Sequence, residues 1–125
     1  MSNSGPGYAK NPQHTVDVRP FAGRVIVEAN GAVLVDTTHA LALHEASYPV
    51  VYYVPRADTR MERLVITDHH TGCPFKGEAS YFSIVSGAEN AVWSYERPYD
   101  EVSSIREYLA FYPNRVDAIR VEPAS

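Results

Sequence analysis

The chain has 125 residues, of which 45% are hydrophobic and 21% are charged, so we expect one ordered globular domain rather than a disordered chain. The net charge of -4 provides no overall positive field for phosphate backbones, and nucleic acid is therefore not an expected partner. No apolar run reaches the length of a membrane span, and the N-terminus lacks the basic start and apolar core of a signal peptide, so we expect no membrane partner.

The N-terminal residues differ in composition from the rest of the chain. Residues 1–13 are rich in Ser, Gly, Asn and Pro, and they carry too little apolar surface to offset the entropy that is lost on ordering. We therefore expect a mobile N-terminal arm at 1–13 and a single β-rich domain at 14–125, with regular structure beginning near His14.

Alternating and β-branched apolar residues predict short β-strands along most of the domain. The clearest prediction is a hairpin of two strands around Asn30-Gly31. Asn-Gly between two such runs is a strong hairpin signal, because both turn residues tolerate positive φ. The run at 39–45 is ambiguous between a strand and a single helical turn. With the pair at 24–29 and 32–36 included, strands are expected at 14–19, 24–29, 32–36, 50–54, 61–66, 79–85, 91–95 and 116–121.

One segment in the C-terminal half is expected to be a helix. Asp100 is a good N-cap, Glu101 lies in the first turn where the helix dipole favours it, and Val102, Ile105 and Leu109 recur at helical spacing. Together with about eight short strands, this predicts a mainly β, or β-rich α+β, fold. The expected architecture is a compact roll, an open barrel or a sandwich closed by one helix.

The segment Cys73-Pro74-Phe75-Lys76-Gly77 contains the only cysteine of the chain. A single cysteine excludes an internal disulfide and suits a reducing compartment, so we expect a cytoplasmic protein. Turn amides and a neighbouring ammonium would favour the thiolate, which makes Cys73 and Lys76 candidate catalytic residues. Alternatively, Cys73 is a small buried hydrophobe and Lys76 is solvated. Because Lys76 replaces the second sulfur of a redox turn, an intramolecular dithiol exchange is excluded.

Five further residues are candidates for ligand binding. Arg56 could hold an anion with two parallel hydrogen bonds, or it could form a salt bridge with Asp58 at the rim of the fold. An inward-facing carboxylate could act as an acid or base, and the aromatic rings could line a cavity or fill the core. These candidates are Tyr53, Arg56, Tyr81, Trp93 and Glu45.

His69 and His70 precede the cysteine by a few residues, so either imidazole could act as a base toward the thiol. The same residues also suit a polar loop between strands. No metal site is expected, because a metal needs three or four converging ligands and only this cluster suggests them. The sequence requires no cofactor.

Four motifs occur in order along the chain: Tyr52-Tyr53-Val54-Pro55-Arg56, Cys73 to Tyr81, Ala91-Val92-Trp93-Ser94-Tyr95 and Leu109-Ala110-Phe111-Tyr112. Together they resemble the domain of unknown function 427 family, and the resemblance covers nearly the whole ordered chain. It implies a small, mostly β domain without a generally established activity. The family is sometimes labelled nucleotidyltransferase-like, but this chain has no closely spaced carboxylate pair beside a Gly-Ser turn to hold magnesium. Members often carry histidine where this chain has Gly72.

The sequence thus predicts a small-molecule enzyme or ligand-binding domain with a pocket near the Cys73-Pro74-Phe75-Lys76-Gly77 turn, and it leaves open whether catalysis occurs. One alternative is a non-catalytic interaction or structural module. A second is the nucleotidyltransferase-like activity that the family label suggests. The oligomeric state also stays open, with a homodimer among the options.

Overall fold

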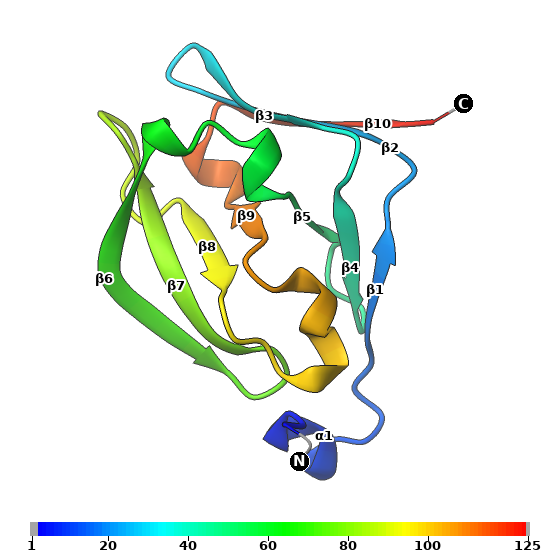
Figure 1. The fold of residues 1–125 in the computed structure, drawn as a ribbon. Helices are drawn as coiled ribbons and strands as arrows, with labels where there is room; N and C mark the ends of the chain where they lie inside the picture. Colours follow the sequence, from blue (N-terminus) through cyan, green and yellow to red (C-terminus); the bar gives the residue numbers. More distant parts are fainter. Residues whose placement is uncertain (1–2, 125) are drawn as a thin grey trace.

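A computed structural model describes residues 3–124, and within this range the protein is mainly β, as predicted. Ten strands form three antiparallel sheets, ordered β1-β4-β5, β10-β2-β3 and β6-β7-β8-β9, and they do not close into a barrel (Figure 1). The strands are β1 (Val16–Pro20), β2 (Gly23–Ala29), β3 (Ala32–Thr37), β4 (Leu41–Glu45), β5 (Val51–Tyr53), β6 (Leu64–Cys73), β7 (Gly77–Ile84), β8 (Val92–Tyr95), β9 (Leu109–Phe111) and β10 (Ala118–Pro123).

The described helices are all short. They are the α-helix α1 (Pro6–Lys10) and the 3-10 helices η1 (Arg56–Asp58), η2 (Met61–Arg63), η3 (Asp100–Ile105) and η4 (Pro113–Arg115). None of the helices in the described range is long and apolar enough to cross a membrane.

The hairpin predicted at Asn30-Gly31 is confirmed. Both turn residues have positive φ, 53° at Asn30 and 72° at Gly31, as a two-residue hairpin turn requires. The turn joins β2 to β3, and Ala29 pairs with Ala32 directly beside it. The ambiguous run at 39–45 contains strand β4, which pairs with both β1 and β5.

The predicted helix at Asp100 is only partly correct. Val102 and Ile105 are buried as expected, but η3 is a 3-10 helix that ends at Ile105, and Leu109 begins strand β9 instead. The reason is a tertiary one: the backbone groups of Leu109 and Val54 exchange two hydrogen bonds, of 2.8 and 2.9 Å. Pairing with a distant strand therefore overrides the local helical spacing.

The segment 61–70 also differs from the prediction. Residues 61–63 of the predicted strand form η2 instead, and His69 and His70, which also suited a polar loop, are part of the ten-residue strand β6. The pairing of β6 with β7 shifts register between Ile66 and His70, so a bulge absorbs this polar stretch. As β6 lies at the edge of its sheet, these side chains remain in solvent.

Two apolar clusters lie on opposite faces of the β6-β7-β8-β9 sheet. On β7, Phe82 and Ile84 contact the first cluster, which also contains the inward side chains of β2 and β3. Ala79 and Tyr81 alternate with them and contact the second cluster. The second cluster consists of Leu43, Tyr53, Ala79, Tyr81, Tyr95, Val102, Ile105 and Ala110, and it is rich in tyrosine.

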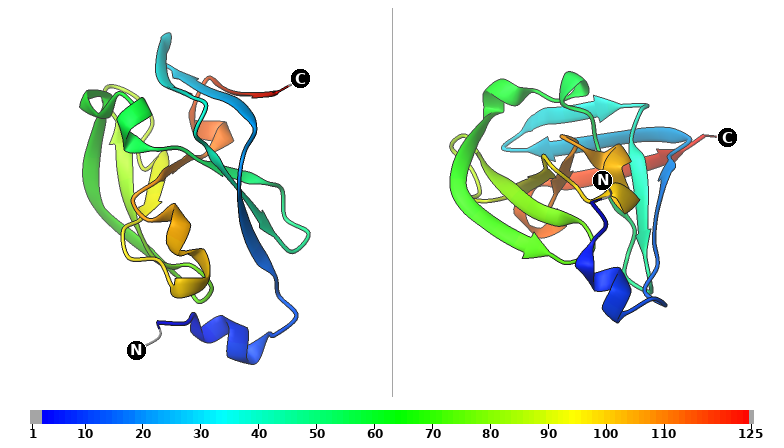
Figure 2. Two further views of the ribbon diagram at one scale, coloured as in Figure 1. Left: turned by 45° about the vertical axis from the view of Figure 1, so that its right-hand side comes forward. Right: turned by 60° about the horizontal axis from the view of Figure 1, so that its bottom comes forward.

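The described part of the N-terminal arm contains helix α1, which the sequence did not indicate. Figure 2 shows α1 at the end of the molecule where the β6–β7 turn lies, far from the C-terminus. Gly7 donates a backbone hydrogen bond of 2.9 Å to the Pro74 carbonyl in that turn. Residues 1–2 of the predicted arm lie outside the described residues, and its mobility stays a prediction.

Candidate functional site

The Cys73–Gly77 turn connects β6 to β7 and places its side chains at one end of the second cluster. Cys73 and Gly77 pair across the hairpin, and Cys73 packs half-buried against that cluster. Gly77 has φ of +121°, and a Cβ there would lie 3.2 Å from the Arg97 carbonyl oxygen. Glycine is therefore required for the geometry of this turn.

Lys76 and Glu45 form an ion pair beside the turn, which joins two of the predicted site residues. Lys76 Nζ lies 2.5 Å from Glu45 Oε1, and the two side chains are only 12% and 15% exposed. The other carboxylate oxygen, Oε2, lies 2.8 Å from His14 Nε2. One carboxylate thus links the ammonium of the turn to an imidazole just before β1, in a place largely shielded from water.

The pKa of Glu45 reflects this shielding and its partners. Burial alone would raise the pKa, but the hydrogen bonds and charges of Lys76 and His14 outweigh burial and leave the pKa below its ordinary value. Glu45 is therefore held as a carboxylate.

Tyrosines from the neighbouring strands face the same region. Burial raises the pKa of Tyr53, which the hydrogen bond from Trp93 opposes, and the Glu45 and Cys73 groups raise this pKa further. Burial also raises the pKa of Tyr95, with smaller contributions from Tyr53 and Cys73. The thiol, the carboxylate and two buried phenols therefore lie within electrostatic range of one another.

Hydrogen bonds also connect the aromatic side chains in and beside the second cluster. Trp93 Nε1 donates to the Tyr53 hydroxyl at 3.3 Å, and the Tyr81 and Tyr112 hydroxyls lie 3.2 Å apart. The Tyr81 hydroxyl also bonds Thr71 on the neighbouring strand, at 2.9 Å. Core filling therefore positions these rings, and their polar ends form two separate hydrogen-bonded groups.

Arg56 is the predicted site residue that the structure does not bring to the turn. Its guanidinium donates to the Glu107 carbonyl at 2.7 Å and to Ser94 Oγ at 3.1 Å, and it lies over the Phe82 ring. Ser94 and Trp93 are consecutive on β8, so they point to opposite faces of the sheet. Arg56 therefore lies on the face opposite Trp93.

An apolar cavity of about 260 Å³ lies between the β10-β2-β3 sheet and strands β5 and β9. Trp93 is the one predicted site residue in its lining, and Lys76 and Cys73 do not contribute to it. The lining consists of Val25, Val27, Val50, Val51, Tyr52, Val54, Trp93, Phe111, Pro113, Ile119 and Val121.

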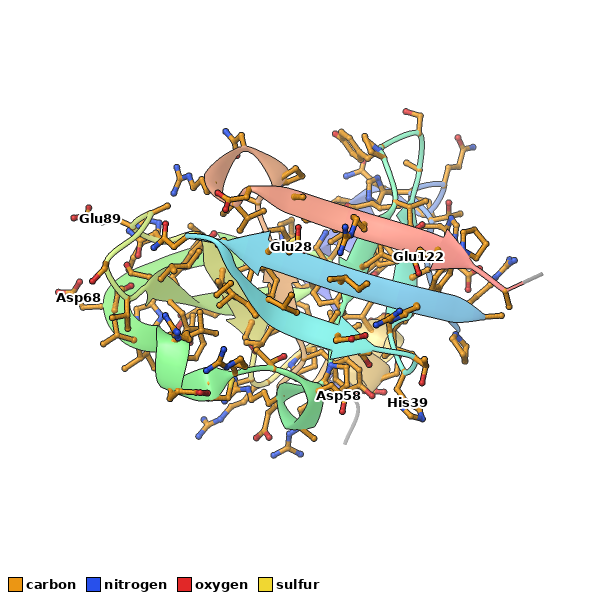
Figure 3. All side chains as sticks on the ribbon, turned by 90° about the horizontal axis from the view of Figure 1, so that it is seen from above. Glu28, His39, Asp58, Asp68, Glu89 and Glu122 are labelled. Carbon is orange, nitrogen blue, oxygen red and sulfur yellow. The ribbon has the colours of Figure 1, made fainter. Side chains whose placement is uncertain are left out.

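The two histidines near the cysteine take part in different contacts. His69 packs edge-on against Tyr81 at 4.5 Å, whereas the exposed His70 lies 3.5 Å from Glu78. Within residues 3–124, no three His, Cys, Asp or Glu side chains are grouped as metal ligands. Figure 3 shows that the labelled carboxylates are spread over the face around β10, β2 and β3 and its margins.

Two residues that no sequence pattern indicated, His14 and Tyr8, complete the surroundings of the turn. His14 stacks on the Phe75 ring at 3.9 Å, and Tyr8 packs edge-on against the same ring at 5.1 Å. Only the pairing of β1 with β4, which sets Val16 opposite Glu45, could have signalled that His14 lies near that carboxylate. That pairing is non-local and has no short-range sequence signal.

The comparisons with known proteins give one match. A family model described as a domain of unknown function (DUF427) matches residues 17–122, which include the strands, the Cys73–Gly77 turn and Glu45 but not His14 or α1. The comparison with curated proteins finds no match for this chain.

Proposed function

This chain belongs to the family described as a domain of unknown function (DUF427), and from that premise we propose that it is a small-molecule enzyme or ligand-binding domain. The proposed site is the space beside the Cys73–Gly77 turn. Cys73 and Lys76 are its reactive groups, and Tyr53, Tyr81 and Trp93 form its aromatic wall.

The observation that carries the proposal is the shielded chain of titratable groups Lys76–Glu45–His14. Burying an ion pair costs desolvation energy, which a protein recovers only with good geometry and further hydrogen bonds. A purely structural turn does not need such a chain beside its half-buried thiol. Shielded titratable groups that share one place with a potential nucleophile are typical of functional sites.

The residues support one reaction type in particular, which is addition to a small electrophilic carbonyl compound. The Cys73 thiolate would attack the carbonyl carbon, forming the C–S bond while the π electrons move to the oxygen. The Lys76 ammonium would then give its proton to that oxygen. Glu45 and His14 would hold Lys76 in place and compensate its charge.

A second candidate is a non-catalytic binding module, and the apolar cavity favours it. The cavity is lined by valine, isoleucine, proline and aromatic side chains and contains no charged group, so a ligand held there would be bound rather than transformed. Trp93 lies between the two candidate locations, since it lines the cavity and also bonds Tyr53.

A metabolite panel distinguishes these functions. Ligands are first found by thermal stabilisation of the protein, and each is then tested for turnover and for its effect on the amide signals of the turn. The proposal expects a stabilising carbonyl compound to shift the signals of residues 73–77, and expects Cys73→Ala and Lys76→Ala to abolish turnover or to weaken binding. Arg120→Gln, on strand β10, is the matched control. If both turn variants retained full turnover and binding, the proposed site would be wrong.

The proposed location is the cytoplasm, because a single thiol without a disulfide partner suits a reducing compartment. Fractionation of cells that produce the chain at its natural level tests this. Recovery with a secreted or membrane fraction would contradict it.

A further inference from the structure

The N-terminal residues 3–14, here called the strap, cover the same turn that holds the proposed site. The strap begins beside η3, crosses the turn through α1 and ends at His14, two residues before β1 (Figure 2). The family match begins at residue 17, so the strap lies outside the matched range.

The first attachment of the strap is to the carboxylates at the start of η3. The Asn3 amide donates to Asp100 Oδ2 at 2.6 Å, and the Gly5 amide donates to Glu101 Oε1 at 3.0 Å. The Ser4 hydroxyl also donates to Glu101. The hydrogen bonds from Ser4 and Gly5 lower the pKa of Glu101 and so keep it charged.

The second attachment is to the backbone of the turn itself. Gly7 donates to the Pro74 carbonyl at 2.9 Å, and the Tyr8 hydroxyl donates to the Phe75 carbonyl at 3.0 Å. Burial first, and then Glu101, Cys73 and Glu45, raise the pKa of Tyr8 to about 12. The Tyr8 hydroxyl is therefore near the thiol and the carboxylate of the proposed site.

Close approach to the turn depends on glycine. A Cβ on Gly5 would lie 2.7 Å from the Pro74 carbonyl oxygen, and a Cβ on Gly7 would lie 2.7 Å from the Phe75 ring. Both glycines are buried, whereas the segment 9–13 that follows is exposed. The strap thus lies tightly against the turn at Gly5 and Gly7, whereas the segment 9–13 that connects it to His14 is exposed to solvent.

We propose that the strap opens and closes over the Cys73–Gly77 turn and so controls when a small molecule reaches Cys73 and Lys76. Residues 3–8 of the strap are held by a few hydrogen bonds and by the edge-on packing of Tyr8 on Phe75, without a large buried apolar side chain. At the far end of the strap, His14 stacks on Phe75 and contacts Glu45. Segments attached in this way open locally without unfolding the domain. The significance of this gating rests on the proposed function, but the opening itself does not.

The test is the rate at which iodoacetamide alkylates Cys73 in the folded protein, followed by mass spectrometry. Deletion of residues 1–10 and the single change Gly5→Ala should each raise the rate at least about threefold, because each weakens the closed state. Ala9→Ser, on the exposed side of α1, is the control and should leave the rate unchanged. If the shortened chain does not fold, the alkylation rate of Gly5→Ala compared with that of the wild type tests the strap proposal alone.

Two results would overturn the strap proposal: equal alkylation rates in the wild type and Gly5→Ala, or a Gly7 amide as protected from hydrogen exchange as the amides of β7. Failure of the proposed function would give a different pattern. In that case the strap variants would still expose Cys73, but no small molecule would bind at the turn.

Discussion

Lys76 Nζ lies 2.5 Å from Glu45 Oε1, although the two residues are 31 positions apart in the sequence. The contact joins the β6–β7 turn to the end of β4, and His14 extends it to the residues that precede β1. One carboxylate thus links the turn of the β6-β7-β8-β9 sheet to two segments in or next to the β1-β4-β5 sheet. We expect the Lys76–Glu45 pair to affect both the stability of the fold and the reactivity of Cys73.

The ion pair should stabilise the fold through a coupling between its two members. Lys76→Met and Glu45→Gln should each lower the free energy of unfolding by about 1–3 kcal/mol, because each leaves a shielded partner without its opposite charge. The double variant should lose less than the sum, with a coupling of about 1 kcal/mol or more. Urea unfolding of the four proteins measures this cycle.

The matched control is the exposed pair Arg19–Asp17 on β1. Its side chains are 72% and 49% exposed, so its coupling should be about 0–1 kcal/mol. Equal couplings for the two pairs would show that the Lys76–Glu45 pair has no special environment.

The stability that Glu45 contributes should depend on pH in a predictable direction. Because the folded pKa lies below the ordinary value of 4.5, the contribution is complete above about pH 4.5 and disappears as the pH falls through the folded value. The difference in unfolding free energy between the wild type and Glu45→Gln should shrink over that window. If the difference between the wild type and Glu45→Gln stayed constant on acidification, the lowered pKa of Glu45 would be contradicted.

Glycine at position 77 should be irreplaceable, whereas glycine at position 72 should not. Gly77→Ala should cost about 1–3 kcal/mol, because φ of +121° is strained for a residue with a Cβ. Gly72→Ala should be neutral or slightly stabilising, since its Cβ would meet no atom within 4 Å. Thermal unfolding compares the two, and equal losses would argue against a strained turn.

Arg56 should prove structural rather than ligand-binding. Arg56→Lys should lower the free energy of unfolding by about 1–2 kcal/mol, because lysine cannot bond both the Glu107 carbonyl and the fully buried Ser94 hydroxyl. The same change should leave the alkylation rate of Cys73 unaltered. A strong effect on Cys73 with no loss of stability would reverse this assignment.

Local signals allowed parts of the fold to be predicted from the sequence. Asn30-Gly31 favours the positive φ angles of its own turn, and the apolar and aromatic residues at 79–85 and 91–95 fit strands that are buried on both faces. In contrast, the extent of η3 depends on the pairing of Leu109 with Val54, which no nearby residue encodes.

The candidate site was predictable in its residue types but not in its grouping. Lys76 and Glu45 were separate candidates, and only the fold shows that they are partners. Arg56 looked suitable for an anion because of its type, yet backbone and hydroxyl acceptors already engage its guanidinium. His14 was missed because the contact depends on the β1–β4 register, a long-range property.

The most direct test of the proposed site is the alkylation rate of Cys73 in the folded protein, compared among charge variants of its neighbours. The thiolate is the reacting form, so Lys76→Met should slow alkylation several-fold and Glu45→Gln should accelerate it, whereas Arg120→Met on β10 should have no effect. A Cys73 that stays inert until the protein unfolds, or that reacts at the same rate in all three variants, would contradict a reactive thiol at this turn.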